Sequence, residues 1–489
     1  MFDNVRRVFG HSIVYGSADI AIQAVNFLLI PIYTRVLSPA EYGALAILLV
    51  FEAFLKPLQR AGLGDSFVRF FYDYPDEDNR RTLAGTIVIS LFGVNAVLLV
   101  VLLLAAPQLA VMVLGTADYT LAVSLLVING SMAAFFVVPF SLLRIQEKST
   151  RLASITFARS LGTVLARLVL VVGLRLGVVG IMLADVVVTV VLLVALSGVT
   201  RSATAWRASK VMAAGTFRFG GPQVLFAFLH QTMAMSDRFF LAVYLPLEQV
   251  GVYLIGSSIA SLIKLYPVAF KTAWMPFAFD RMDREGAPAL FAKMATYAFG
   301  VLVFSTLSLA VLAEGVVTLM TPSSFHRAID VVPILVLGMA VQTTTNFIAT
   351  SVEVAKRTLL YPASTLAAAV LTVTGHLILI PRFGMLGAAL AVGSGQVLQA
   401  VSLGFLAQRV YHIPYEWARL SKTVAVALLL YVLIITTTGG PGLGVLAFRI
   451  LLLATFPLGL LAVRFFRPAE LADIRRLPGM LGARSGRVA

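Results

Sequence analysis

Two stretches of the sequence share one pattern. Residues 175–184 are Arg-Leu-Gly-Val-Val-Gly-Ile-Met-Leu-Ala, and residues 382–391 are Arg-Phe-Gly-Met-Leu-Gly-Ala-Ala-Leu-Ala. Both follow RxGxxGxxLA, at an offset of 207 residues. Several matches at nearly one offset indicate an internal duplication. Further residues match at an offset of 208: Leu37 with Leu245, Gly43 with Gly251, Lys148 with Lys356, Thr150 with Thr358, Lys56 with Lys264, and Gln23 with Gln231.

Long apolar runs surround these motifs. Runs of about 18 residues or more predict membrane-spanning helices, and we place fourteen of them. The offset covers six helices, an even number, so the two repeats have the same orientation. The predicted spans are 12–35, 42–64, 82–106, 118–143, 153–174, 178–200, 215–243, 250–272, 292–321, 329–351, 359–380, 384–408, 420–438 and 443–465.

The predicted fold is therefore an all-α integral membrane protein with two parallel six-helix lobes and two appended helices. Residues 1–214 form the N-lobe with helices 1–6, and residues 215–410 form the C-lobe with helices 7–12. Residues 411–465 hold helices 13 and 14, and residues 466–489 are a basic tail. We interpret the glycines of the repeated motif as packing residues at helix starts rather than as binding residues.

Composition and charge agree with a membrane location. Hydrophobic residues make up 59% of the chain and charged residues 12%, against about a quarter charged in soluble domains. Of the 38 Lys and Arg residues, 31 fall at the N-terminus, in even-numbered loops or in the tail. This asymmetry predicts cytoplasmic termini, and it explains the net charge of +15 without nucleic acid as a partner. The absence of cysteine and five scattered His residues predict neither a metal site nor a cofactor.

Two short motifs resemble those of a known family. Arg35-Val-Leu-Ser-Pro-Ala-Glu-Tyr-Gly43 resembles the RxLxxxEyG signature of bacterial polysaccharide flippases. Ser236-Asp-Arg-Phe-Phe-Leu followed by Val250-Gly-Val-Tyr253 resembles the pattern of their second lobe. These are the Wzx-type transporters of O-antigen and exopolysaccharide synthesis, within the multidrug/oligosaccharidyl-lipid/polysaccharide exporter superfamily.

The resemblance implies a function and its partners. Members move undecaprenyl-diphosphate-linked oligosaccharide from the cytoplasmic to the periplasmic leaflet of the bacterial inner membrane. We expect the lipid-linked oligosaccharide, membrane lipids and other polysaccharide-pathway membrane proteins as partners. In the lipid II flippases of the superfamily the last two helices form a groove for the lipid tail, and helices 13 and 14 are expected to do the same.

Charged residues within predicted spans are the candidate substrate site, because ionisable groups there usually face the protein interior. Lys56 and Lys264 occupy matching positions and could bind a diphosphate, although snorkelling to the interface explains them equally well. Gln23 and Gln231 also match and suit sugar hydroxyls or helix–helix hydrogen bonds. Arg60 and Arg35 complete the predicted substrate set.

A second set of residues is predicted to couple transport to a proton or sodium gradient. It consists of Asp237, Arg238 and Glu52. A structural ion pair between Asp237 and Arg238 is the alternative, and Glu52 could simply neutralise Lys56 four residues later. His376, like His230, is interpreted as a packed residue.

Other functions are less well supported. A multidrug or lipid II exporter would share the fold. The acidic run Asp73-Tyr-Pro-Asp-Glu-Asp78 could suggest a membrane glycosyltransferase or ligase, but we interpret it as a solvated turn because no soluble domain accompanies it. The sequence has no phosphate-binding loop, and we predict that the protein is not an enzyme.

Overall fold

The fold was obtained as a computed structural model. It describes residues 27–266, 284–355, 360–438 and 442–468, and in addition residues 270, 274, 277, 278, 280–282, 357, 440 and 470. In this part of the chain every regular element is a helix. Ten candidate spans among the described residues are long and apolar enough to cross a membrane. The predicted all-α membrane fold is thus confirmed, while the count of fourteen and the cytoplasmic termini stay predictions.

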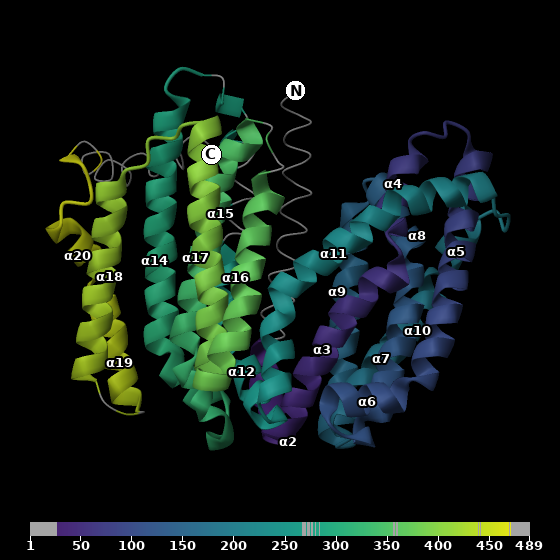
Figure 1. The fold of residues 1–489 in the computed structure, drawn as a ribbon, viewed down its shortest axis with the longest axis horizontal. Coiled ribbons are helices and arrows are strands. Elements are labelled where there is room, and N and C mark those ends of the chain that lie inside the picture. The colour runs from purple at the N-terminus through teal and green to yellow at the C-terminus, as the bar shows by residue number, and fades with distance from the viewer. Residues whose placement is uncertain are drawn as a thin grey trace, which may run out of the picture.

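The helices form two groups that meet at one end and diverge toward the other (Figure 1). The first group, the N-lobe, holds the elements from α2 to α10. They are α2 (Ile30–Val36), α3 (Pro39–Arg60), α4 (Leu63–Phe71), α5 (Glu77–Leu104), α6 (Ala106–Leu114), η1 (Ala117–Tyr119), α7 (Thr120–Ala133), η2 (Ala134–Phe136), α8 (Val137–Ile145), α9 (Ser149–Arg167), the π-helical η3 (Leu168–Gly173) and α10 (Gly177–Ala203).

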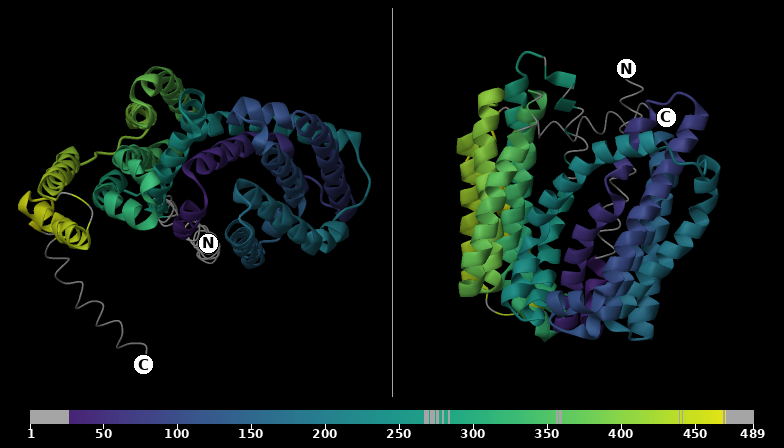
Figure 2. Two further views of the ribbon diagram at one scale, coloured as in Figure 1. Left: turned by 90° about the horizontal axis from the view of Figure 1, so that it is seen from below. Right: turned by 45° about the vertical axis from the view of Figure 1, so that its right-hand side comes forward.

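The second group, the C-lobe, carries the appended helices on its outer side (Figure 2). The C-lobe holds α12 (Leu247–Ala260), η4 (Ser261–Lys264), α14 (Ala287–Met320), η5 (Ser323–Asp330), α15 (Val332–Val354), α16 (Leu360–Phe383) and α17 (Met385–Val410). The appended helices are α18 (Trp417–Thr437), α19 (Leu443–Leu453) and α20 (Phe456–Ala462).

One long helix, α11 (Lys210–Tyr244), connects the lobes. It packs against α4 and α5 of the N-lobe and against α12, α16 and α17 of the C-lobe. Pro222 lies within α11, where it removes one backbone hydrogen bond and weakens the helix locally. The predicted lobe boundary at 214/215 falls inside this helix.

Local signals in the sequence set where the helices begin. Ser38 caps α3 in a capping box with Glu41, and Pro39 occupies the first turn, where its missing N–H costs nothing. Asp76 caps α5, and hydrogen bonds from the backbone and side chain of Asn79 lower the pKa of Asp76. Asp73 forms an exposed ion pair with Arg69. The acidic run therefore behaves as a solvated turn and a helix cap.

The repeated RxGxxGxxLA motif has the same role in both lobes. Gly177 and Gly384 have left-handed φ values of +56° and +58°, which favour glycine. A Cβ on Gly180 would meet the carbonyl oxygen of Leu170 at 3.1 Å, and one on Gly387 would overlap that of Leu379. Both second glycines thus let a helix start close to the preceding helix, in agreement with a packing role.

The two lobes touch most closely through α3 and α12, at a contact that we name the gate contact. It consists of Pro39 and Gly43 from α3 and Leu247 and Gly251 from α12. A Cβ on Gly43 would overlap the Leu247 carbonyl, and one on Gly251 would overlap the Pro39 carbonyl. Because Gly43 and Gly251 are repeat equivalents, the contact is reciprocal.

Apolar side chains from both lobes pack around the gate contact in one core. Leu45 and Leu48 of α3 belong to it, together with Val250 and Leu254 of α12, and all four are buried. Close backbone approach and van der Waals packing in a core shared by the lobes favour the closed arrangement at this end. The gate contact is therefore held shut by packing rather than by charge.

We predict that Gly251→Leu weakens the gate contact. The new side chain cannot fit against the Pro39 carbonyl, so the lobes must separate at this end. The chain has no cysteine, so a single Leu254→Cys, buried in the shared core, reports separation through its rate of maleimide labelling. We expect a severalfold faster rate with Gly251→Leu. Gly93→Leu is the control, because a Cβ on Gly93 meets nothing within 4 Å; equal rates in the two variants would contradict the prediction.

Candidate functional site

A polar cavity of about 330 Å³ lies at the end of α3 opposite the gate contact. Residues of α3, the α3–α4 corner, α8 and α11 line it, so it opens where the lobes diverge. Its polar and charged lining residues are Lys56, Arg60, Asp65, Ser141, Arg144, Gln223 and Gln231. We name it the cationic cavity.

Hydrogen bonds beside the cationic side chains anchor this end of α3. Gln59, three residues beyond Lys56, is buried and donates to the Val127 carbonyl at 3.2 Å and to the Ser131 hydroxyl at 3.2 Å. Asn95 of α5 donates to the Gln59 carbonyl at 2.8 Å. These bonds hold α3 against α5 and α7, and next to this contact Lys56 and Arg60 line the cavity.

A tight corner brings α11 to the cavity. Ala61 and Gly62, which follow α3, both have left-handed φ values, +50° and +67°. A Cβ on Gly62 would overlap the carbonyl of Gly220 in α11. The Ser66 hydroxyl donates to the Thr216 carbonyl at 2.9 Å. The glycine contact and this hydrogen bond hold α11 against the corner, so that Gln223 and Gln231 of α11 line the cavity.

The charges around the cavity are mainly positive. Lys56 and Arg60 interact with each other and with Arg159 of α9, and Arg144 adds to the repulsion at Arg60. Glu52 and Asp65 offset part of this charge. The guanidinium of Arg159 lies 5.2 Å from the centre of the Phe136 ring, a cation–π arrangement. Four cations facing two carboxylates leave a site that favours an anion.

The structure brings together only part of the predicted substrate set. Lys56, Arg60 and Gln231 line the cationic cavity. Arg35 ends α2 beside the gate contact, and the ~1.5 Å rise per residue of α3 separates it from Lys56 by roughly 25 Å. Lys264 ends η4 in the C-lobe and does not line the cavity. Gln23 lies outside the described residues.

Sequence reasoning missed Arg144 and Asp65. Arg144 lies in the last turn of α8. In the sequence, a basic residue at such a helix end cannot be distinguished from a charge that only sets topology. Asp65 lies in the first turn of the short helix α4, and the predicted span 42–64 ends one residue before it.

The predicted coupling residues of the C-lobe form a separate buried cluster. Asp237 is only 8% exposed. It accepts hydrogen bonds from the Tyr253 hydroxyl at 3.0 Å and from the Arg238 backbone amide at 2.8 Å. The Arg238 guanidinium donates to Ser257 at 3.1 Å. The charges of Asp237 and Arg238 also reach Lys264. Glu52, the third predicted coupling residue, is separate from this cluster, and its charge acts on Lys56 and Arg60.

An apolar groove of about 830 Å³ separates the C-lobe from α18. Helices α14, α15 and α17 line one side, and α18 with its preceding loop lines the other. The lining is almost wholly apolar. Its residues are Ala295, Phe299, Thr344, Phe347, Ile348, Ala400, Val401, Gly404, Phe405, Gln408, Tyr415, Trp417, Ala418, Leu420, Ser421 and Val424.

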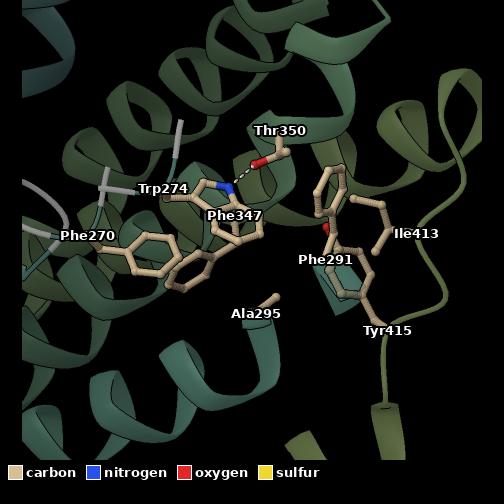
Figure 3. A pocket seen from close by; sticks show the side chains of 8 residues that line it. All are labelled: Phe270, Trp274, Phe291, Ala295, Phe347, Thr350, Ile413 and Tyr415. Atoms are coloured by element: carbon tan, nitrogen blue, oxygen red, sulfur yellow. Dashed lines mark hydrogen bonds between the residues drawn. The ribbon is translucent and has the colours of Figure 1, made fainter. Parts of the chain in front are cut away.

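An aromatic cluster adjoins this groove and shares lining residues with it; Figure 3 shows the cluster. The rings of Phe270 and Phe347 meet edge to face, with their centres 4.9 Å apart. The Trp274 indole donates to the Thr350 hydroxyl at 2.9 Å, which orients the ring. Phe347 and Tyr415 belong to the cluster and also line the groove. The cluster therefore forms a rigid apolar wall beside the groove.

Charged contacts fasten the appended helices to α14 at two heights. At one end Arg419 of α18 and Lys293 of α14 both pair with Glu470, at 2.9 and 3.3 Å. At the other end Arg449 of α19 pairs with Glu314 of α14 at 2.6 Å and donates to the Thr438 hydroxyl at 3.0 Å. Both sets contain buried charges, and removing one partner of a buried ion pair strongly destabilises the folded state. These contacts hold α18 and α19 in place on α14, and the groove lies at the end where Arg419 pairs with Glu470.

Glu470 has an unusual environment among the described acidic residues. It is 6% exposed. Burial alone would raise its pKa, but hydrogen bonds from the Arg467 backbone amide, Tyr297, Arg419 and Lys293 lower the pKa of Glu470 to about 2. Glu470 therefore stays ionised at neutral pH and stabilises the folded state.

No group of His, Asp and Glu among the described residues could hold a metal ion. The arrangement that remains is a two-lobed helical membrane protein with a cationic cavity between the N-lobe and α11 and an apolar groove beside the C-lobe.

The similar structures share the fold at low sequence identity. One is the lipid II flippase MurJ in an inward closed conformation, with a TM-score of 0.70, 14% identity, and coverage of 93% of this chain and 97% of that chain. Another is a multidrug resistance transporter of the MATE family and MOP superfamily in an inward-facing conformation, with a TM-score of 0.60, 16% identity and coverage of 84% and 99%. A MOP superfamily transporter from Pyrococcus furiosus has a TM-score of 0.51, 16% identity and coverage of 86% and 96%.

The family follows from the sequence itself. Residues 32–329 match the model of a family described as polysaccharide biosynthesis protein. The match covers more than half of the chain, and the chain belongs to this family. The resemblance stated from the two short motifs is thereby confirmed. No curated protein sequence matches the chain.

We predict that Glu470→Gln destabilises the protein at neutral pH. A pKa of about 2 in the folded protein, against 4.5 for an ordinary Glu, corresponds to a stabilisation on the order of 3 kcal/mol. This contribution is complete above the unfolded pKa and is lost as the pH falls through the folded value. The difference in melting temperature between wild type and variant should be constant above pH ~4.5 and shrink below it.

The exposed Glu77→Gln is the control for this measurement, because Glu77 lies in the first turn of α5, away from the appended helices. Melting of the purified protein in detergent, followed by circular dichroism, reports both variants. If Glu470→Gln melts at the wild-type temperature at pH 7, the ion pairs of Glu470 do not stabilise the attachment of α18.

Proposed function

We propose that the chain is a flippase of the bacterial inner membrane. It moves undecaprenyl-diphosphate-linked oligosaccharide from the cytoplasmic to the periplasmic leaflet, and it acts as a transporter without catalytic chemistry. The observation that carries this proposal is the pairing of a cationic cavity with a separate, long apolar groove. A cargo with an anionic head and a long apolar tail needs both.

The cationic cavity suits the diphosphate. A diphosphodiester carries two negative charges, and Lys56, Arg60 and Arg144 present hydrogen-bond donors to the same space. Charge-assisted bonds of Arg to phosphate oxygens are among the strongest in proteins. Gln223 and Gln231 offer both donors and acceptors, which fits the first sugar beyond the phosphates.

The apolar groove suits part of the lipid tail. Each CH₂ group that leaves water contributes about 0.8 kcal/mol, but a tail inside a membrane gains nothing from burial alone. The groove would therefore act by shape, holding the tail at a fixed place beside α18. Gly404 has no side chain, so the groove is wide at α17. A Cβ there would find room, because its nearest neighbour would be Ile348 at an ordinary contact distance of 3.7 Å.

Alternating access supplies the movement. The lobes meet at the gate contact and diverge at the cationic cavity (Figure 1), so the cavity faces one side only. With the predicted topology that side is the cytoplasm, where the cargo is made. Rocking the lobes would open the gate contact and close the cavity mouth, with bending near Pro222 of α11, the helix that packs against both lobes.

A leaflet assay for lipid-linked sugar tests the proposal in cells that lack the protein. We expect undecaprenyl-diphosphate glycan to accumulate on the cytoplasmic side and wild type to reverse this. Lys56→Ala with Arg144→Ala should reduce flipping at least tenfold, because each lost charge-assisted bond costs about 1.5–3 kcal/mol. Arg69→Ala is the control, since Arg69 pairs with Asp73 on the surface.

The outcomes separate the candidate functions and sites. Normal transfer of lipid-linked sugar without the protein would refute the flippase and favour a small-molecule exporter of the same fold. Full activity of the Lys56/Arg144 variant would refute the cationic cavity as the head-group site. Lys264→Ala alone tests whether the repeat-equivalent lysine of the C-lobe also contributes.

The groove has its own test. Gly404→Trp would fill it at α17, and we expect flipping of a cargo with the natural long tail to fall severalfold. A short-chain analogue of about ten carbons should be flipped at the wild-type rate, since it need not enter the groove. Leu428→Trp is the control, because Leu428 of α18 is exposed outside the groove. An equal loss for both tail lengths would place the effect elsewhere.

A further inference from the structure

The imidazole of His376 in α16 is unusual among the described polar groups. It is 0% exposed, yet neither of its ring nitrogens has a hydrogen-bond partner. Its ring lies 5.4 Å from that of Phe240 in α11, centre to centre. A buried polar group without a partner costs about 1–3 kcal/mol. Structures retain such a cost mainly at sites with a function.

The groups facing His376 come from α11 and α17, the two helices that pack most extensively on α16. From α11 the charge of Asp237 reaches the imidazole, with Arg238 beside it. The hydroxyl of Ser236 is also buried without a partner. In α17 no titratable residue occurs between positions 385 and 408. Asp237 is therefore the charged group that acts on this ring directly.

The chemistry of this pocket fits a proton better than a metal ion. Sodium and divalent ions such as Mg²⁺ prefer several oxygen ligands. Here the single carboxylate already accepts from Tyr253 and Arg238. A neutral imidazole has one free nitrogen lone pair, and a nearby carboxylate favours the charged form once water can enter. Arg238 opposes that effect, so the balance depends on how open the pocket is.

The pocket is joined to the gate contact through the core shared by the lobes. Tyr253, whose hydroxyl donates to Asp237, is fully buried in that core, and Phe240, whose ring lies beside His376, packs against the same core. Separation of α3 from α12 at the gate contact would disrupt this core. Asp237 and His376 would then gain access to the solvent on that side.

We propose that His376 is the proton-binding residue of the C-lobe, neutral while the gate contact is closed and protonated when it opens. A proton from the outer solvent adds to the free ring nitrogen, and no other bond forms or breaks. Closure of the gate contact buries the ring again, which favours the neutral imidazole, and the proton leaves toward the side of the cationic cavity. Only one part of this inference rests on the proposed function, namely that inward proton flow would drive outward movement of the cargo.

Linkage gives the expected effect on the gate. If protonation requires an open gate contact, acid must favour the open state. The ratio of open to closed protein then rises by up to about tenfold for each unit by which the pKa of the imidazole differs between the two states. The gate can be followed without any substrate by the labelling of Leu254→Cys. Ala117→Cys, in the exposed η1 turn, corrects for the effect of pH on thiol reactivity.

The experiment uses the full chain in nanodiscs at pH 7.5 and 5.5. We expect the corrected labelling rate to rise severalfold at pH 5.5 in the wild-type background. His376→Leu should remove this rise and keep the gate closed, and His376→Gln should also remove it. His326→Gln is the matched control, because His326 is partly exposed and contacts the Thr321 carbonyl; it should keep the wild-type response. An unchanged rise in both His376 variants would overturn the proposal.

A measurement on the unaltered imidazole decides the matter if the His376 variants do not fold. The five His residues can be labelled with ¹⁵N and followed by NMR. One signal should resist titration over the pH range in which the others titrate in wild type, and should titrate near the ordinary value of about 6.5 in Gly251→Leu. Identical titration of all signals in both proteins would refute the link to the gate.

These outcomes are independent of the leaflet assay. If lipid-linked sugar is not the cargo, the pH response of the gate and its dependence on His376 still stand, and only the cargo is refuted. If the flippase is active but the gate does not respond to pH through His376, the coupling site is refuted and the proposed function remains.

Discussion

At the gate contact, two glycines remove the Cβ atoms that would otherwise keep the lobes apart. Gly43 lies against the Leu247 carbonyl and Gly251 against the Pro39 carbonyl. Glycine is the residue that allows helices to approach backbone to backbone. Everything at the other end of the molecule depends on this contact, because lobes joined at one end and linked by α11 must diverge at the other. The cationic cavity lies where they diverge.

The duplication sets the architecture but not the chemistry. Lys56 and Lys264 are repeat equivalents, yet Lys56 lies among Arg60, Arg144 and Arg159, whereas Lys264 lies near Asp237 and Arg238. Packing glycines are kept in both lobes because both need the same helix approach. Charged residues differ between the lobes. In the proposed transport cycle, the N-lobe holds the anionic head and the C-lobe holds the proton.

Much of the fold follows from sequence because its causes are local. Apolar length predicts the spans, and the motif at 175–184 and 382–391 predicts the repeat. Lys56 and Arg60 could be predicted as a cationic face, since charges inside a span are rarely without a role. Arg144 could not, because its position at the end of α8 looks like a topology charge. Arg35 belongs to a family motif, but the length of α3 keeps it far from the cavity. The groove and its fixed contacts depend on residues far apart in the chain, such as Lys293 and Glu470, which no local pattern connects.

The attachment of α18 to α14 has a mechanical consequence for a lipid-linked cargo. Because charged contacts fix the appended helices at two heights, the groove moves with the C-lobe. The main cations of the head-group site belong to the N-lobe. Head and tail would then be held by different rigid bodies, and rocking would change the distance between them. A flexible polyprenyl chain tolerates that change, whereas a rigid cargo would resist it. The separation of the two sites thus favours a lipid-linked cargo over a compact drug-like molecule.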